Sequence, residues 1–211
     1  MSDIFELKEL AFAYPAQKTL LSGINLSISN KDKILLTGEN GSGKSTLLKL
    51  LVGLLKPLSG SVLFHGTPIE TAKAQTFRSL IFLLQNAREN LFGLSPRHDL
   101  QLWQIAHPES INHQVAEQIV SLYRDKWNSP YSTLSDGEIR ALLMCVLPYL
   151  REQFWILDEP FVALDAVRKR ELMELMAAKA GGLLVVSHGA EEHRALFDRV
   201  LCLNNGTLRE L

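Results

Sequence analysis

The stretch GENGSGKST at residues 38–46 constrains the fold of this chain more than any other part of its sequence. Before it, the apolar residues of 33–38 predict a short buried strand, and after it residues 45–57 repeat apolar side chains at the helical period. A strand, a glycine-rich loop and a helix in this order are typical of a phosphate-binding loop. A chance Gly/Ser turn is the alternative, but all fixed positions of the motif are present: Gly38, Gly43, Lys44 and Ser45.

The residue types of this loop match the chemistry of a bound triphosphate. Glycines allow consecutive backbone N–H groups to face one anion, and the N-terminus of the following helix adds partial positive charge. Lys44 would reach the β- and γ-phosphates, Ser45 would bind Mg²⁺ through its hydroxyl, and Thr46 would add a hydroxyl near the α-phosphate. The predicted binding residues are therefore Gly38, Glu39, Asn40, Gly41, Ser42, Gly43, Lys44, Ser45 and Thr46.

Two acids follow the apolar run of 154–157 and are expected at the carboxyl end of a buried strand. Ligands of open α/β sheets bind at that end. Asp158 is predicted to complete the Mg²⁺ shell, and Glu159 to act as a general base on an attacking water. Acids also simply cap strand ends, so the functional interpretation depends on the phosphate loop upstream.

Strand and helix patterns alternate along the chain and predict an α/β fold, a P-loop NTPase with a central, mainly parallel sheet. Further strands are expected at 4–10, 20–28, 60–66, 79–85, 154–158 and 182–188, with a hairpin at 199–211. The earliest strands suit antiparallel pairing at a sheet edge. We therefore expect a single domain, residues 1–211, with its core at 1–85 and 151–211 and a helical subdomain at 86–150.

The helical insert carries two local signals. Ser95 and Pro96 have the types of an N-cap and first helical residue. Further along, one face of a second helix is marked by Ile111, Val115, Ile119, Leu122 and Tyr123.

Composition excludes several classes of protein. The formal net charge of −1 provides no basic field for nucleic acid. The longest apolar stretch, 141–150, falls short of the roughly 20 residues of a membrane span, and the N-terminus has no secretion signal. Cys145 and Cys202 lack metal-ligand spacing and are expected to be buried thiols, with a disulfide or metal pair as the alternative. A cytoplasmic location is expected unless a partner recruits the chain to a membrane.

Four more motifs follow the phosphate loop in a fixed order: LSDGE at 134–138, ILDEP at 156–160, ALD at 163–165 and SH at 187–188. In this order and spacing the chain resembles the ATP-binding subunits of ABC transporters over essentially all 211 residues. The resemblance implies binding and hydrolysis of ATP with Mg²⁺. It also implies two such subunits placed head to tail. Each phosphate loop would face the partner's signature sequence, which is the segment LSDGE at 134–138.

Four site residues follow from the resemblance alone. Tyr14 matches the aromatic that stacks on adenine, although a half-buried strand aromatic is the alternative. Gln85 matches the glutamine that touches the metal and the attacking water, with a polar strand end as the alternative. His188 matches the switch histidine near the γ-phosphate, and Asp165 the acid that crosses the dimer interface. The spacing of His188, Glu191, Glu192 and His193 fits no zinc site.

The signature sequence departs from the common LSGGQ pattern at Asp136 and Glu138. Ser135 and Glu138 form a capping box, which alone predicts only a stable helix end. The resemblance implies more, because the Ser135 hydroxyl and the Gly137 amide would meet the γ-phosphate held by the partner. Asp136 is expected to point outward. The residues at 139–150 also lack the family's usual basic and glutamine positions.

Residues 85–93, QNARENLFG, are similar to the corresponding segment of cobalt-type and energy-coupling-factor importers. The expected partners are a second ABC ATPase subunit, identical or different, and an integral membrane transport subunit on the inner face of the cell membrane. No nucleic acid is expected. The alternative function is a soluble ABC ATPase acting on a complex such as a metal-cluster scaffold, while a P-loop kinase would leave the signature sequence unexplained.

Overall fold

The computed structural model describes residues 3–16, 18–72, 79–122, 125–150, 153–162, 164–187 and 194–211. The chain divides into two compact units. The first consists of Met1–Phe82, Gln153–Pro160 and Ala180–Leu211, and the second of Leu83–Glu152 and Phe161–Lys179. Sequence reasoning assigned all of 151–211 to the core, whereas the segment Phe161–Lys179 belongs to the helical unit.

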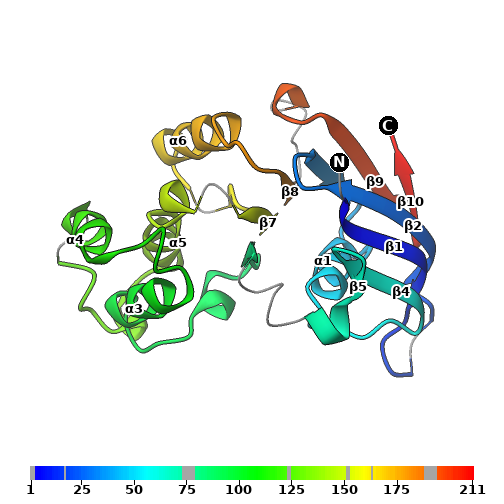
Figure 1. Ribbon diagram of the computed structural model, residues 1–211, viewed down its shortest axis with the longest axis horizontal. Helices are drawn as coiled ribbons and strands as arrows, with labels where there is room; N and C mark the ends of the chain where they lie inside the picture. The colour runs from blue at the N-terminus through cyan, green and yellow to red at the C-terminus, as the bar shows by residue number, and fades with distance from the viewer. Residues whose placement is uncertain are drawn as a thin grey trace. The chain divides into compact units, whose positions relative to one another are not determined.

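Two sheets form the first unit (Figure 1). One is antiparallel, in the order β2 (Leu21–Ser29), β1 (Asp3–Phe12), β4 (Ser59–Phe64) and β5 (Thr67–Pro68). Buried and exposed residues alternate along β2, as expected for a strand with one face in the core. The antiparallel N-terminal strands of the prediction are therefore confirmed.

The other sheet is mainly parallel. Its order is β10 (Thr207–Glu210), β9 (Arg199–Asn204), β3 (Lys33–Thr37), β8 (Leu183–Val186), β7 (Phe154–Asp158) and β6 (Leu80–Leu83). β3 runs parallel to both β8 and β9, and β7 runs parallel to β8. β7 and β8 are buried along their whole lengths, as continuous apolar runs in parallel sheets are. The turn between β9 and β10 has positive φ at Asn205 and Gly206, which hairpin turns of this length favour.

Helix α1 (Lys44–Leu51) joins the two sheets of the first unit into one core. Its buried leucines belong to one cluster with residues of β1 and β2 from the antiparallel sheet and of β3, β7 and β8 from the parallel sheet. The helix is shorter than the predicted segment 45–57, because the chain leaves the helical conformation at Val52 and Gly53 takes a φ of 72°.

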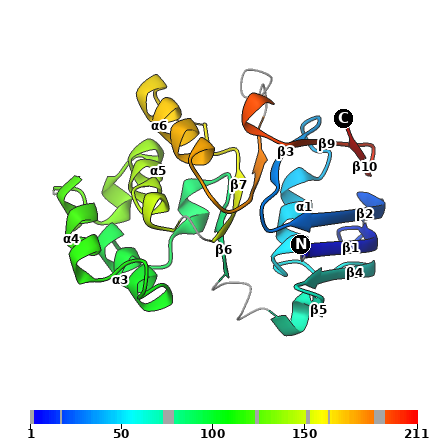
Figure 2. The same cartoon turned by 45° about the horizontal axis from the view of Figure 1, so that its top comes forward.

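The second unit is helical, as Figure 2 shows. Its elements are η1 (Ala87–Asn90), α3 (Pro96–Ala106), α4 (His113–Leu122), η2 (Tyr131–Thr133), α5 (Asp136–Met144), η3 (Leu147–Tyr149) and α6 (Ala166–Ala177). The predicted start of α3 is confirmed, since the Ser95 side chain accepts a hydrogen bond from the His98 amide and Pro96 occupies the first turn. No helix in the described part of the chain has both the length and the apolar character to cross a membrane.

The predicted apolar face of α4 is only partly correct. Ile119 is fully buried, and Ile111 is buried but precedes the helix. Leu122 is 60% exposed, and Tyr123 lies outside the described residues. The buried face is instead formed by Ala116, Ile119 and Val120. Leu122, at the helix end, lines a hollow beside α5 and α6 rather than the core.

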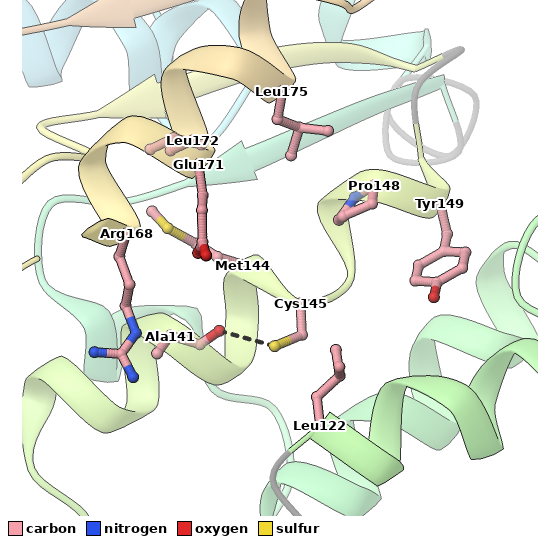
Figure 3. A pocket seen from close by; sticks show the side chains of 10 residues that line it. All are labelled: Leu122, Ala141, Met144, Cys145, Pro148, Tyr149, Arg168, Glu171, Leu172 and Leu175. Atoms are coloured by element: carbon pink, nitrogen blue, oxygen red, sulfur yellow. Dashed lines mark hydrogen bonds between the residues drawn. The ribbon is translucent and has the colours of Figure 1, made fainter. Parts of the chain in front are cut away.

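That hollow has a volume of about 470 Å³ and contains the Cys145 side chain (Figure 3). The thiol is turned back onto its own helix, with Sγ 3.2 Å from the Ala141 carbonyl oxygen. Burial raises the pKa of this thiol to about 11. Cys145 and Cys202 are both free, and each is half-buried rather than fully buried as the sequence suggested.

Candidate functional site

The phosphate loop connects the end of β3 to the start of α1. Gly43 is the N-cap of α1 and has a φ of 102°, with no side chain capping the helix and no acid in its first turn. Gly38 has a φ of 142°, and a Cβ atom there would collide with the backbone carbonyl of Leu203. The glycines are therefore required by backbone conformation and close contact, and the amides at this helix end are free of side-chain acceptors.

The Lys44 side chain folds back over the loop. Its Nζ donates hydrogen bonds of 2.8 Å to the carbonyl oxygens of Gly38 and Glu39. Burial lowers the pKa of Lys44, and this effect is partly offset by the nearby carboxylates of Glu159 and Asp158. The cation and the two acids therefore share one electrostatic environment, as a site for a metal-bound triphosphate requires.

Asp158 ends β7, and Glu159 follows it directly, as predicted. Both are buried, with 2% and 5% of their surfaces exposed. The Glu159 amide donates a 2.9 Å hydrogen bond to the Val186 carbonyl at the end of β8. Glu159 also has a φ of 49°, which is uncommon for a residue with a side chain and is found disproportionately at functional sites.

Tyr14 lies against the first turn of α1. Its hydroxyl is 3.1 Å from Oγ1 of Thr46, and its ring meets Phe12 edge to face with centroids 4.9 Å apart. Tyr14 is 36% exposed, so part of its surface remains accessible.

The oxygen donors of the first unit suit the hard cation Mg²⁺. Ser45 in the first turn of α1 offers a hydroxyl and Asp158 a carboxylate, which are ligand types that Mg²⁺ prefers. Ser42 Oγ is buried in the same loop with no hydrogen-bond partner among the described residues, so this hydroxyl is available to bind a ligand. The residues present therefore fit a nucleoside triphosphate with its metal.

The signature sequence begins α5, and the predicted capping box is present. Ser135 Oγ accepts a hydrogen bond from the Glu138 amide, while a Glu138 carboxylate oxygen accepts 2.9 Å bonds from both the amide and the hydroxyl of Ser135. Lys126 Nζ lies 2.8 Å from the other Glu138 oxygen. The Lys126 bond and the two Ser135 bonds lower the pKa of Glu138 to about 2.

Asp136 has a partner that sequence reasoning missed. Arg88 Nε lies 2.8 Å from Asp136 Oδ1. The same guanidinium donates hydrogen bonds of 3.2 Å and 2.9 Å to the carbonyl oxygens of Tyr131 and Leu134, just before α5, the signature helix. The acid at position 136, where the common pattern has glycine, was the one available signal that a cation would be needed.

Gln85 is exposed and begins the segment that carries Arg88. Its carbonyl oxygen accepts a hydrogen bond from Arg140 of α5. The turn after it is fixed by buried Asn90, which bonds both the amide and the carbonyl of Leu84. Arg140 and Asn90 were also missed, because neither belongs to a recognisable motif.

The predicted site residues fall in both units of the chain. The phosphate loop, Tyr14 and the acid pair belong to the first unit, and Gln85, Ser135 and Gly137 to the second. His188 and Ala163 lie outside the described residues, as do Glu191, Glu192 and His193. Asp165 is the N-cap of α6 and accepts a 2.9 Å bond from the Arg168 amide. In the described part of the chain, no group of three or more potential metal ligands clusters.

The ABC transporter family matches residues 21–162, which is more than half of the chain. This chain belongs to that family. It is an ATP-binding subunit, and its hydrolysis of ATP powers transport.

Individual relatives agree with this assignment. The chain is 28% identical to the energy-coupling factor transporter ATP-binding protein EcfA of Methanothermobacter thermautotrophicus, over 97% of this chain and 69% of that protein. It is 32% identical to the cytochrome c biogenesis ATP-binding export protein CcmA 2 of Salmonella paratyphi A, over 81% and 82%. The fold superposes with a TM-score of 0.83, at 21% identity, on a dimeric ATP-binding cassette bound to ADP and phosphate, covering 98% of this chain and 97% of that one.

Proposed function

We propose that this ABC subunit hydrolyses ATP in a site shared by two ABC subunits, with the phosphate loop of one chain opposite the signature helix of the other. The open N-terminus of α1, with Lys44 and the two acids close by, is the observation that carries the ATP site. The exposed Ser135 and Asp136 at the start of α5 support the shared arrangement, because this helix end is accessible to a second molecule.

Each residue has a role in this proposal. The loop amides and Lys44 bind the β- and γ-phosphates, and Tyr14 stacks on the adenine. Ser45, Asp158 and Gln85 would hold Mg²⁺, which offsets charge on the phosphates when bound. Glu159 accepts a proton from the attacking water, while Gln85 and His188 position that water and the γ-phosphate. The partner's signature helix contacts the γ-phosphate through the serine hydroxyl and the glycine amide that correspond to Ser135 and Gly137 here.

We further propose that an integral membrane subunit docks on the segment 86–94. Phe92 and Leu94 are 77% and 84% exposed, and two exposed large apolar side chains close together in sequence suit a contact surface. The similarity of residues 85–93 to energy-coupling-factor importers, together with the relation to EcfA, supports an importer of that type. The chain would then be held on the inner face of the membrane by its partner. The second ATPase subunit is either an identical chain or a different one.

The substitution Glu159→Gln tests the site. The amide has a similar shape but cannot accept the proton, so ATP binding should persist while hydrolysis falls by about 100-fold or more. The variant should accumulate as an ATP-bound dimer, measured by size-exclusion chromatography with light scattering. Glu70→Gln, at an exposed position in the same unit, is the matched control and should behave as wild type. A Glu159→Gln variant with wild-type turnover would assign the base elsewhere, with His188 as the first alternative.

A further inference from the structure

The Arg88 guanidinium connects three points around the start of α5. Its Nε pairs with the Asp136 carboxylate at 2.8 Å, and its two terminal nitrogens reach the carbonyl oxygens of Tyr131 and Leu134. A planar guanidinium with several fixed donors is suited to this combination, whereas a lysine ammonium is not. Arg88 therefore pairs with the Asp136 charge and also holds the backbone just before the N-terminus of the signature helix.

Asp136 makes this contact necessary. It lies in the first turn of α5 beside Ser135 and Gly137, the two residues that would meet the partner's γ-phosphate. An unpaired carboxylate at this point would repel an approaching triphosphate, and repulsion between charges a few ångströms apart is strong where water is excluded. A paired carboxylate presents much less net charge. Asp136 is 62% exposed in the described subunit, so a second subunit would cover it together with its partner cation.

Arg88 itself is held in place from its own side. It lies in η1, whose N-cap Asn86 accepts a 3.0 Å bond from the Arg88 amide. Asn90 fixes the same turn to Leu84 through two further hydrogen bonds. Three hydrogen bonds therefore hold the turn that follows Gln85, and the guanidinium connects this turn directly to the start of α5.

The second ion pair at this helix end behaves differently. Glu138 pairs with Lys126, but its carboxylate is also held by the amide and hydroxyl of Ser135. Loss of Lys126 would leave Glu138 in the capping box. Loss of Arg88 would leave the Asp136 carboxylate without this cation, beside the Ser135 and Gly137 groups that would meet the phosphate.

We propose that Arg88 is a positioning residue for ATP hydrolysis, which acts by neutralising and orienting Asp136 so that the signature helix can close on the partner's nucleotide. The proposal rests on the shared ATP site proposed above. In that site, Asp136 replaces the glycine of the common pattern, and the Arg88 cation compensates for its charge. The effects of Arg88 and Asp136 on hydrolysis should therefore depend on each other.

The experiment measures kcat and KM for ATP in Arg88→Ala, Asp136→Gly and the double variant, with Lys126→Ala as the matched control. Arg88→Ala should lower kcat by about tenfold with little change in KM, because nucleotide binding by the phosphate loop is untouched. Removing Asp136 as well should bring kcat back to within about threefold of Asp136→Gly, since the uncompensated charge is gone. Lys126→Ala should remain within about twofold of wild type, and Arg88→Lys should fall between wild type and Arg88→Ala.

Two kinetic results would overturn the proposal: wild-type kcat in Arg88→Ala, or a double variant as slow as Arg88→Ala. The second would mean that Arg88 acts only by holding the Tyr131 and Leu134 carbonyls. Hydrogen exchange tests the contact without ATP, so it remains decisive if the wild-type chain proves inactive and the shared site is rejected. Backbone amides of residues 86–90 and 135–138 should exchange faster together in Arg88→Ala than in Lys126→Ala, and equal protection in both would also refute the inference.

Discussion

The two helix ends at which this chain would meet phosphate differ in how their backbone amides are satisfied. At α1 the N-cap is Gly43, no side chain caps the helix, and a lysine begins the first turn. At α5 the N-cap Ser135 and Glu138 satisfy each other's backbone groups, and two acids occupy the first turn. The N-terminus of α1 is left open for an anion, while the N-terminus of α5 is already capped by side chains of this chain.

This difference suits the two helix ends to different steps of the proposed reaction. An open helix N-terminus with a nearby cation binds an anion before any partner arrives. A capped end is stable when exposed in a single subunit, but the Asp136 carboxylate, which lies outside the capping box, must be neutralised before a phosphate can approach. Arg88 is the cation that pairs with Asp136, whereas Lys126 pairs with Glu138, which Ser135 already holds.

The largest effect is expected at the open end. Lys44→Ala removes the charge that we propose binds the β- and γ-phosphates, so ATP affinity should fall by about 100-fold or more. A direct titration with a fluorescent ATP analogue measures it. Lys49→Ala, in the last turn of the same helix, is the matched control and should leave affinity unchanged. Retained affinity in Lys44→Ala would contradict the assignment of the open end to ATP.

A smaller effect is expected from Asp136→Gly at the capped end. Loss of a first-turn acid should lower the free energy of unfolding by about 0.3–1 kcal/mol, and glycine adds a comparable cost. ATPase activity should change by less than about tenfold, because Arg88 already neutralises the acid. Urea unfolding and steady-state turnover measure the two effects, with Asp136→Asn separating charge from backbone freedom. A far larger gain in activity would show that the acid restrains the enzyme despite its ion pair.

The smallest effect concerns pH. Hydrogen bonds from Lys126 and Ser135 hold the pKa of Glu138 at about 2, below its ordinary value of 4.5. Because the folded-state pKa is lowered, the stabilisation by this carboxylate is complete above pH 4.5 and is lost as pH falls toward 2. The melting temperature of wild type should therefore exceed that of Glu138→Gln at neutral pH, and the gap should narrow below pH 4.5. A gap that is constant from pH 7 to pH 3 would show that charge plays no part in the cap.

Local sequence signals predicted most of the fold and the parts of the site that depend on neighbouring residues. The phosphate loop, the strand before Asp158, the Ser95 cap and the capping box all involve residues within a few positions of one another. Contacts between distant residues were missed. Arg88 and Asp136 lie on separate elements, and no periodicity or motif relates them.

Boundaries set by tertiary packing were also missed. The predicted core includes all of 151–211, whereas α6 lies within Phe161–Lys179 and belongs to the helical unit. The apolar character of Leu122 placed it on a buried face, yet it lies at a helix end beside a hollow, where packing rather than hydrophobicity decides exposure. Roles that come from the family resemblance, such as those of Tyr14 and Gln85, stay predictions.

The contact of Gly38 with Leu203 has a consequence for the order of events during folding. The loop begins against β9, and Thr37, the residue before it, bonds the Leu201 carbonyl across 164 positions of sequence. Closing so long a stretch of chain is slow compared with forming a hairpin or a helix. During synthesis the loop therefore emerges early but acquires its final shape only after β9 has been made and has joined β3. A nascent chain that ends before β9 would carry the complete phosphate-binding motif without the neighbouring backbone that shapes it.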